Sequence, residues 1–200
     1  MRQIKQMSKI FTIMGKSATG KDHIYKDVLR RLNLTPVITY TTRPIRQNER
    51  EGVEYHFVTE EEMVRLETAG VIIEKRCYHT VAGDWYYFTC DDGQITDDKD
   101  ALMIVTPEAY VQIRDYYGAA RVVPVYIESN GGDRLRRSLK REEKQAAPNY
   151  AEVCRRFLAD EEDFSEEKLS AYGIGPETRF DNNSELADCV ERVVAFIQGR

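Results

Sequence analysis

The sequence contains no long hydrophobic run and few cysteines. The apolar run nearest the N-terminus, Ile10–Met14, is shorter than the core of a signal peptide, and no segment approaches the length of a membrane span. We therefore expect neither secretion nor a membrane partner. The four cysteines are scattered without a C-x-x-C pair, which favours free thiols in a reducing compartment over disulfides or a zinc site. The sequence thus predicts a cytoplasmic protein.

An excess of basic charge is also missing. The 29 lysines and arginines are outnumbered by 34 acidic residues, and the net charge of −5 argues against a general nucleic-acid binder. Basic residues are nevertheless concentrated in two places: Arg43, Arg46 and Arg50, and Arg134, Arg136, Arg137, Lys140 and Arg141. Such local clusters in a mildly acidic chain favour a small polyanionic ligand. We expect small-molecule partners, no nucleic acid, and either a monomer or a homodimer.

Short buried strands alternate with helices along most of the chain, which predicts an α/β fold with a parallel sheet covered on both faces. The expected strands are Lys9–Met14, Val37–Tyr40, Ala101–Val105, Val122–Ile127 and Thr178–Phe180. The expected helices are Asp22–Leu32, Pro107–Gly118, Gly132–Glu143, Tyr150–Leu169 and Ser184–Ile197, with Ser184 as the N-cap of the last.

The stretch from about Thr39 to Phe88 is richer in strands than the rest and indicates an inserted lobe. Its expected elements are strands at Tyr55–Val58, Val71–Arg76 and Trp85–Thr89 and a helix over Glu60–Glu67. The acidic segment Asp91–Asp100 that follows is expected to be mobile.

A glycine-rich loop stands between the first strand and the first helix and fits the pattern G-x-x-x-x-G-K, followed by Asp where Ser or Thr is usual. Its residues are Gly15, Lys16, Ser17, Ala18, Thr19, Gly20, Lys21 and Asp22. In such a loop the backbone N–H groups surround phosphates and the lysine reaches the outer ones. The sequence therefore predicts an ATP-binding loop with Lys21 as a catalytic residue.

Asp22 takes the place of the hydroxyl that normally ligates Mg²⁺. A carboxylate is also a hard oxygen ligand, so we predict Asp22 as the metal ligand. Two other interpretations stay open: the loop holds a phosphate in a changed arrangement, or Asp22 is a helix N-cap.

Arg43 and Arg46 precede Tyr55 in a polar segment, and this combination could hold a phosphate monoester through charge-assisted hydrogen bonds. The segments T-T-R-P-x-R, at 41–46, and G-x-x-Y-x-F, at 52–57, resemble the guanylate kinase family, one of the P-loop nucleoside monophosphate kinases. The resemblance covers most of the chain.

That resemblance implies a P-loop NTPase-type three-layer α/β fold with a parallel sheet, a core at 1–38 and 100–200, a mixed α/β nucleotide-monophosphate-binding lobe inserted at 39–89, and a helical lid at about 134–156. It implies the reaction ATP + GMP to ADP + GDP, with Mg²⁺. By resemblance, the acceptor's phosphate would be bound by Arg43, Arg46, Tyr55 and Tyr87, and its guanine by Thr39, Glu74 and Thr89. The catalytic residues would be Lys21 with the lid arginines Arg137, Arg141 and Arg156.

The chain departs from the family pattern in three places. Ile104 and Thr106 replace acidic residues at a strand end, Phe88 replaces glycine in Tyr-Gly-Thr/Ser, and extra residues stand around Thr80–Asp84. Two alternatives therefore stay open. Ribose 1,5-bisphosphate phosphokinases resemble this fold and carry G-K-D, and a guanylate-kinase-like binding module without catalysis would tolerate the missing carboxylates.

Overall fold

The computed structural model describes residues 7–47, 49–80 and 83–200. The start of the N-terminal segment and two of the extra residues around Thr80–Asp84 lie outside this description. Within it, no helix is both long and apolar enough to cross a membrane. The four cysteines are free thiols, as predicted.

A five-stranded sheet has the order β2-β7-β1-β8-β9, and its outer pairs β2–β7 and β8–β9 are parallel. Its strands are β1 (Ile10–Met14), β2 (Thr35–Pro36), β7 (Ala101–Ile104), β8 (Val122–Glu128) and β9 (Arg179–Asp181). All five residues of β1 are buried, as expected for a strand inside a parallel sheet with covered faces.

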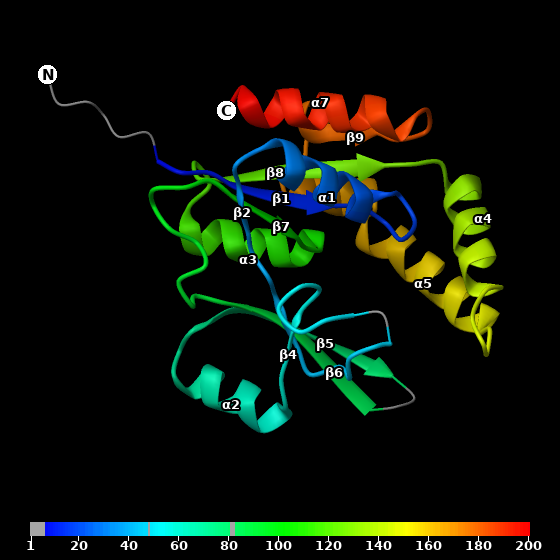
Figure 1. Ribbon diagram of the computed structural model, residues 1–200, viewed down its shortest axis with the longest axis horizontal. Helices are drawn as coiled ribbons and strands as arrows, with labels where there is room; N and C mark the ends of the chain where they lie inside the picture. The colour runs from blue at the N-terminus through cyan, green and yellow to red at the C-terminus, as the bar shows by residue number, and fades with distance from the viewer. Residues whose placement is uncertain (1–6, 48, 81–82) are drawn as a thin grey trace, which may run out of the picture. The chain divides into compact units, whose positions relative to one another are not determined.

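A second, mixed sheet has the order β4-β3-β6-β5. Its strands are β3 (Tyr40–Thr41), β4 (His56–Phe57), β5 (Ile72–Thr80) and β6 (Gly83–Cys90), and the helix beside it is α2 (Glu60–Thr68). β3 pairs with β4 in parallel and with β6 antiparallel, and β5 and β6 are antiparallel. Figure 1 shows these strands and α2 together in the cyan and green part of the chain.

The chain divides into two compact units. The first contains residues up to Ile10, Leu34–Met103 and Glu108–Val122, and therefore the mixed sheet and α3 (Pro107–Tyr117). Its mixed sheet packs an apolar face, with Phe88 and Cys90 fully or nearly buried, against Met63 and Leu66 of α2. The opposite face of that sheet is consequently left for polar side chains.

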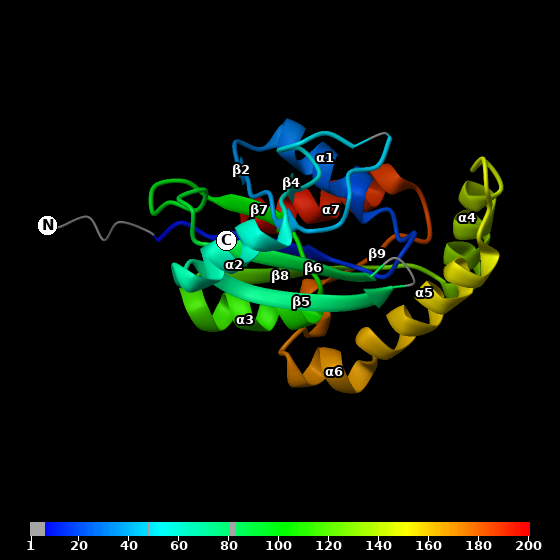
Figure 2. The same ribbon diagram turned by 90° about the horizontal axis from the view of Figure 1, so that it is seen from below.

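The second unit contains Phe11–Asn33, Ile104–Pro107 and Val123–Arg200. Its helices are α1 (Lys21–Arg31), α4 (Gly131–Glu142), α5 (Tyr150–Asp163), α6 (Glu166–Ala171) and α7 (Leu186–Gln198), and a short 3-10 turn, η1 (Pro176–Thr178), precedes β9. Helix α1 packs on α7, and Figure 2 shows α1 and α6 on opposite sides of β8. Helix α7 buries Val190, Val193, Val194 and Ile197, the spacing of one helix face.

The expected strand Val37–Tyr40 is wrong. β2 and β3 lie in different sheets, and the residues between them are not strand. The amide side chain of Gln94 takes the place of a strand partner, because it accepts from the Ile38 N–H at 2.8 Å and donates to the Ile38 carbonyl at 3.1 Å. A side chain distant in sequence therefore satisfies the backbone groups of Ile38 between the two sheets.

The expected single helix Tyr150–Leu169 is also wrong, because it divides into α5 and α6. Phe164 is buried and stacks on Tyr126 of β8 with ring centroids 5.6 Å apart. Ser165 then caps α6 by accepting from the Lys168 N–H. Burial of one aromatic ring thus coincides with the break.

One predicted N-cap and one open alternative are wrong. Helix α7 begins after Glu185 without a side-chain cap, so Ser184 is not its N-cap. The N-cap of α1 is Gly20, and Asp22 is the second residue of the helix, so the interpretation of Asp22 as N-cap is wrong. Asp22 still lies in the first turn, where a negative charge is favourable.

Candidate active site

The glycine-rich loop depends on two glycines. A Cβ at Gly15 would lie 2.8 Å from the carbonyl oxygen of Ile127, which is too close for any other residue. Gly20 has φ +91°, and a Cβ there would lie 2.7 Å from Nδ2 of Asn182. The loop then leads directly into α1, whose first residue is Lys21. The predicted strand–loop–helix context is therefore confirmed, while ATP binding by the loop stays a prediction.

Asn182, which follows β9, binds the backbone of the glycine-rich loop and was not predicted. Its Nδ2 donates to the Thr19 carbonyl at 2.7 Å, and its side chain is buried. The neighbouring Asn183 accepts from the Asn130 N–H at 2.6 Å, just before α4. The available signal was the pair of asparagines that begins two residues after the strand expected at Thr178–Phe180, since the ends of parallel strands gather functional residues.

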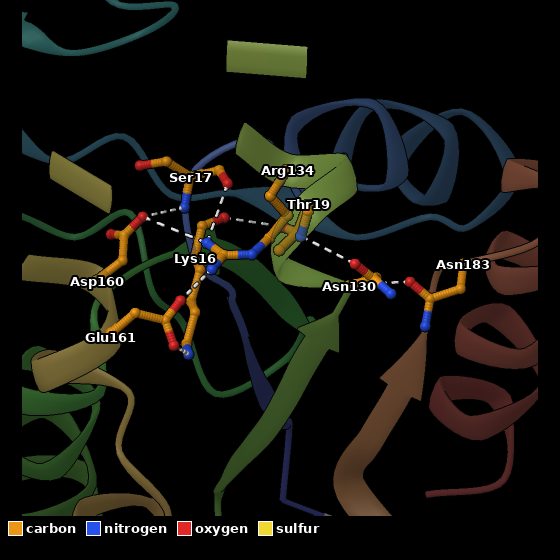
Figure 3. A network of polar contacts seen from close by, with 9 residues as sticks. Lys16, Ser17, Thr19, Asn130, Arg134, Asp160, Glu161 and Asn183 are labelled. Atoms are coloured by element: carbon orange, nitrogen blue, oxygen red, sulfur yellow. Dashed lines mark hydrogen bonds and ion pairs between the residues drawn. The ribbon is translucent and has the colours of Figure 1, made fainter. Parts of the chain in front are cut away.

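Carboxylates of α5 lie against the loop (Figure 3). The Ser17 N–H donates to Oδ2 of Asp160 at 2.6 Å, and Nζ of Lys16 lies 2.6 Å from Oε2 of Glu161. A backbone N–H of this loop is the kind of donor that would hold a phosphate oxygen. Asp160 therefore supplies an anion to the loop from within the chain.

Arg134 of α4 joins these groups. Its side chain is 1% exposed, it is ion-paired with Glu161 and lies 3.7 Å from Oδ2 of Asp160, and its guanidinium lies 4.8 Å from the ring centre of Phe157. Burial raises the pKa of Glu161, but contacts with Lys16 and Arg134 lower it more, so its pKa lies below the usual value. The sequence placed Arg134 only in a basic cluster and gave no signal of its burial.

The lid arginines differ in position. Arg137 lies near the loop, since its Nη1 donates to the Ala18 carbonyl at 3.3 Å. Arg141 is exposed one turn further along α4. Arg156, on α5, is paired with Glu152 at 3.1 Å. Of the three, the structure brings Arg137 to the loop.

The carboxylates available for a metal ion stand at other positions than in the family pattern. Asp22 is exposed in the first turn of α1, while Ile104 and Thr106 carry none. Glu128, at the end of β8 and opposite Asp181 in register, has its pKa raised by burial, with Lys16 and Arg179 acting against that. Asp22 can therefore offer oxygen to a cation, but its role as metal ligand stays a prediction.

In the first unit, most of the residues predicted for the acceptor share one face of the mixed sheet. Glu74 is paired with Thr89 across β5 and β6, and Thr41 is paired with Tyr87 across β3 and β6. Because side chains alternate along strands, this face is the one opposite Phe88 and the apolar contact with α2. Phe88, which replaces the family's glycine, thus belongs to the core of the lobe.

Arg43 is the most enclosed residue of this group. Its side chain is 3% exposed, its Nη atoms donate to both carboxylate oxygens of Glu49 at 2.9 and 2.8 Å, and its Nε donates to the Tyr87 hydroxyl at 3.1 Å. Burial lowers the pKa of Arg43, but Glu49 and Tyr87 raise it more. The arginine is thereby held in one orientation by a carboxylate and a phenol.

Tyr55 completes the aromatic surroundings of Arg43. The guanidinium lies 5.6 Å from the Tyr55 ring centre, and Tyr55 meets Tyr87 edge-on at 5.6 Å. Arg46 is exposed, with its backbone N–H bound to Glu49. The structure therefore gathers Arg43, Tyr55 and Tyr87, and leaves Arg46 at the surface near Glu49.

The predicted base-reading residues are also close together. Glu74 is 2% exposed and accepts from the Thr89 hydroxyl at 2.7 Å, and Thr39 is buried just before β3. Glu74 has a further partner that the sequence did not suggest, Arg76, two residues along β5. The predicted group is thus assembled, with one additional arginine.

Comparison with known proteins identifies the family. A family model described as guanylate kinase matches residues 7–167. The chain is 32% identical to a guanylate kinase from Thermotoga maritima, covering 95% of this chain and 86% of the relative, and 29% identical to one from Porphyromonas gingivalis, covering 94% and 95%.

The crystal structure of guanylate kinase from Anaplasma phagocytophilum matches with a TM-score of 0.67 at 20% identity, covering 98% of this chain and 88% of that chain. This likeness confirms the predicted α/β fold of the P-loop NTPase type. The resemblance found in the motifs is therefore confirmed, and the chain belongs to the guanylate kinase family.

Proposed function

We propose that this chain transfers the γ-phosphoryl group of ATP to GMP, giving ADP and GDP. The observation that carries this proposal is the shared polar face of the mixed sheet, where Glu74 and Thr89 lie beside the group of Arg43 and Tyr87. The Glu74 carboxylate suits the donor edge of guanine, and the Arg43 guanidinium with the Tyr87 hydroxyl suits a phosphate monoester. The family membership supports the same reaction.

The donor would be held by residues 15–22. Backbone N–H groups from Lys16 to Lys21 would surround its phosphates, and Lys21 would reach the outer ones. Arg137, already near Ala18, would neutralise charge that develops during transfer, with Arg141 and Arg156 approaching as the lid closes. Catalysis would rest on positioning and electrostatics, without a covalent intermediate.

Mg²⁺ would be held on the protein side by Asp22. Its exposed carboxylate, next to Lys21, is the hard oxygen donor that this ion prefers. When bound, the ion would neutralise phosphate charge. The chain's own contribution would be to orient ATP and to keep Lys21 beside its outer phosphates.

The acceptor's phosphate would meet Arg43, Arg46, Tyr55 and Tyr87, and its guanine would meet Glu74, Thr39 and Thr89. Arg43 is bound to Glu49 and to Tyr87, so its guanidinium is already oriented when the acceptor arrives. The guanidinium would attract the phosphate and the aromatic rings would limit its movement.

The acceptor lobe would span 39–89, with the core at 1–38 and 100–200 and the lid at about 134–156. The partners would be ATP and GMP, with neither nucleic acid nor membrane, in a cytoplasmic monomer or homodimer.

The test is a coupled assay of ADP formation with Mg–ATP and GMP, dGMP, AMP, UMP or ribose 1,5-bisphosphate as acceptor. We expect GMP and dGMP to be used well and AMP and UMP poorly. Preferential use of ribose 1,5-bisphosphate would reassign the acceptor. Binding of ATP without turnover of any acceptor would support a binding module instead.

A further inference from the structure

The carboxylate expected to read guanine is already bound by its own chain. Nε of Arg76 donates to Oε2 of Glu74 at 2.9 Å, and Nη2 of Arg76 donates to Oε1 at 3.3 Å. The Thr89 hydroxyl donates to Oε1 at 2.7 Å. Three donors therefore occupy a carboxylate that is 2% exposed.

This occupation conflicts with guanine binding through Glu74 alone. A carboxylate has roughly four lone-pair sites, and three are used here. Guanine presents N1–H and the exocyclic amine side by side, so it needs two acceptors. One contact must be released before both donors can be bound, and the longest is Nη2 of Arg76 to Oε1.

If Nη2 of Arg76 releases Glu74, its N–H becomes available to the ligand, and Arg76 is positioned to offer it. It lies two residues from Glu74 on β5, on the same face, and opposite Tyr87. Burial lowers the pKa of Arg76, but Glu74, Tyr78 and Tyr55 raise it more. Its side chain, 11% exposed, is therefore enclosed within the acceptor face.

We propose that Arg76 is a specificity-determining residue that donates to O6 of the acceptor's purine. This inference rests on the proposed GMP site. In guanine, O6 is adjacent to N1–H, so Arg76 and Glu74 together match the sequence acceptor, donor, donor along one edge. On binding, Nη2 exchanges Oε1 of Glu74 for O6, and the freed lone pair accepts a donor of the base.

Arg76 also explains how adenine would be rejected twice. Adenine carries an amine in place of O6, so a donor would face the Arg76 donor, and N1 would face the Glu74 carboxylate without a proton. Hypoxanthine keeps O6 and N1–H and loses only the amine. The arginine should therefore select 6-oxopurines, while Glu74 distinguishes guanine from hypoxanthine.

The experiment is calorimetric binding of GMP, 6-thio-GMP and IMP to the full-length protein, wild type and Arg76→Met. Sulfur is a weak acceptor, so wild type should bind GMP about tenfold more tightly than 6-thio-GMP, the value of one net hydrogen bond. In Arg76→Met this ratio should fall below about twofold. The GMP/IMP ratio, which depends on the amine, should stay as in wild type.

Lys75→Met is the matched control, because Lys75 is the adjacent cation on the opposite face and pairs with Glu67. It should leave both ratios unchanged. Arg76→Lys keeps the charge beside Glu74 if the methionine variant fails to fold, and it should lower the GMP/6-thio-GMP ratio, since an ammonium lacks the planar fork.

The ratios separate two kinds of failure. A GMP/6-thio-GMP ratio that is the same in wild type, Arg76→Met and Arg76→Lys, with GMP still bound, would overturn the role of Arg76 alone. Failure of wild type to bind any of the three purine nucleotides would instead refute the proposed acceptor.

Discussion

The donor loop and the acceptor face are both held by ion pairs and charged hydrogen bonds within the chain. The partners come from different distances along the sequence. At the loop, Ser17 is bound by Asp160, 143 residues away, and Lys16 by Glu161, 145 residues away. On the acceptor face, Arg43 is bound by Glu49, six residues away, and Glu74 by Arg76, two residues away. The ionic partners on the acceptor face are therefore local, whereas those of the loop belong to the distant helix α5.

This difference bears on what each ligand must displace. An acceptor can exchange one hydrogen bond within a single strand. A donor phosphate at Ser17 must replace a carboxylate anchored on a helix of 14 residues that also carries Arg156. We expect donor binding to be coupled to movement of α5, and acceptor binding to leave its strands in place.

The largest expected effect is at the donor side. Lys21→Met should lower kcat by about 10²–10³-fold, because it removes a cation aimed at charge that increases during transfer. Lys26→Met, an exposed cation further along α1, is the control and should retain wild-type kcat. Steady-state rates at saturating ATP and GMP measure both, and equal losses in the two variants would contradict the assignment of Lys21.

A change of intermediate size tests the α5 carboxylate that binds the loop. Asp160→Asn keeps the size of the side chain and removes its charge, so ATP should bind about tenfold more tightly, the value of one charged hydrogen bond no longer competing. Asp163→Asn, one turn later on α5, should change ATP affinity little. Equilibrium dialysis without acceptor gives the Kd values. An unchanged Kd in Asp160→Asn would show that the loop is not blocked by Asp160.

A smaller effect concerns metal dependence. Asp22→Ala should raise the Mg²⁺ concentration for half-maximal rate several-fold, because one oxygen ligand is lost. Asp22→Ser should rescue only in part, since Ile104 and Thr106 offer no supporting carboxylate. Mg²⁺ titration of the initial rate at fixed ATP compares the three proteins. Superimposable curves would limit Asp22 to a favourable charge in the first turn of α1.

The smallest effect is on stability at the acceptor side. Burial raises the pKa of Glu49, but Arg43 and Arg46 lower it more, so the folded value lies below the unfolded one. The stabilisation is therefore present above the ordinary value near 4.5 and is lost as the pH falls through the folded value. Glu49→Gln should lower the free energy of unfolding by about 1 kcal/mol at pH 7.

That difference between Glu49→Gln and wild type should close in acid, because protonated glutamate and glutamine are then equivalent. Urea unfolding at pH 7 and below pH 4 measures it. A gap that is constant with pH would mean that Arg43 does not depend on the charge of Glu49.

Local signals were enough for much of the fold. The strand at Ile10–Met14 and the helix from Lys21 differ by one residue from their expected bounds, because a buried run, a glycine-rich loop and an amphipathic helix are all encoded within short windows. The break at Phe164 was missed, because it depends on a ring in β8. The irregular backbone at Ile38 was missed for the same reason, because its partner Gln94 lies 56 residues away.

The candidate site divides in the same way. Arg43 and Tyr55 stand in motifs, whereas the pairing of Glu74 with Thr89 depends on the register between β5 and β6. Nothing local indicates that Asp160 reaches Ser17, since the pairing exists only after α5 has packed beside the loop. The position of Arg76 is predictable from the sequence, because it stands two residues after Glu74 in one strand and therefore shares its face.

The carboxylates that α5 places against the loop also determine how ATP binding should respond to salt. Lys16 and Arg134 already have anionic partners, so incoming ATP replaces one set of negative charges by another. Few dissolved anions therefore have to leave the basic groups when ATP binds. Added salt screens the ion pairs within the chain and the attraction between these groups and ATP to a similar extent. The affinity for ATP should therefore vary only weakly with ionic strength, which would let this loop work over a wide range of solute concentrations.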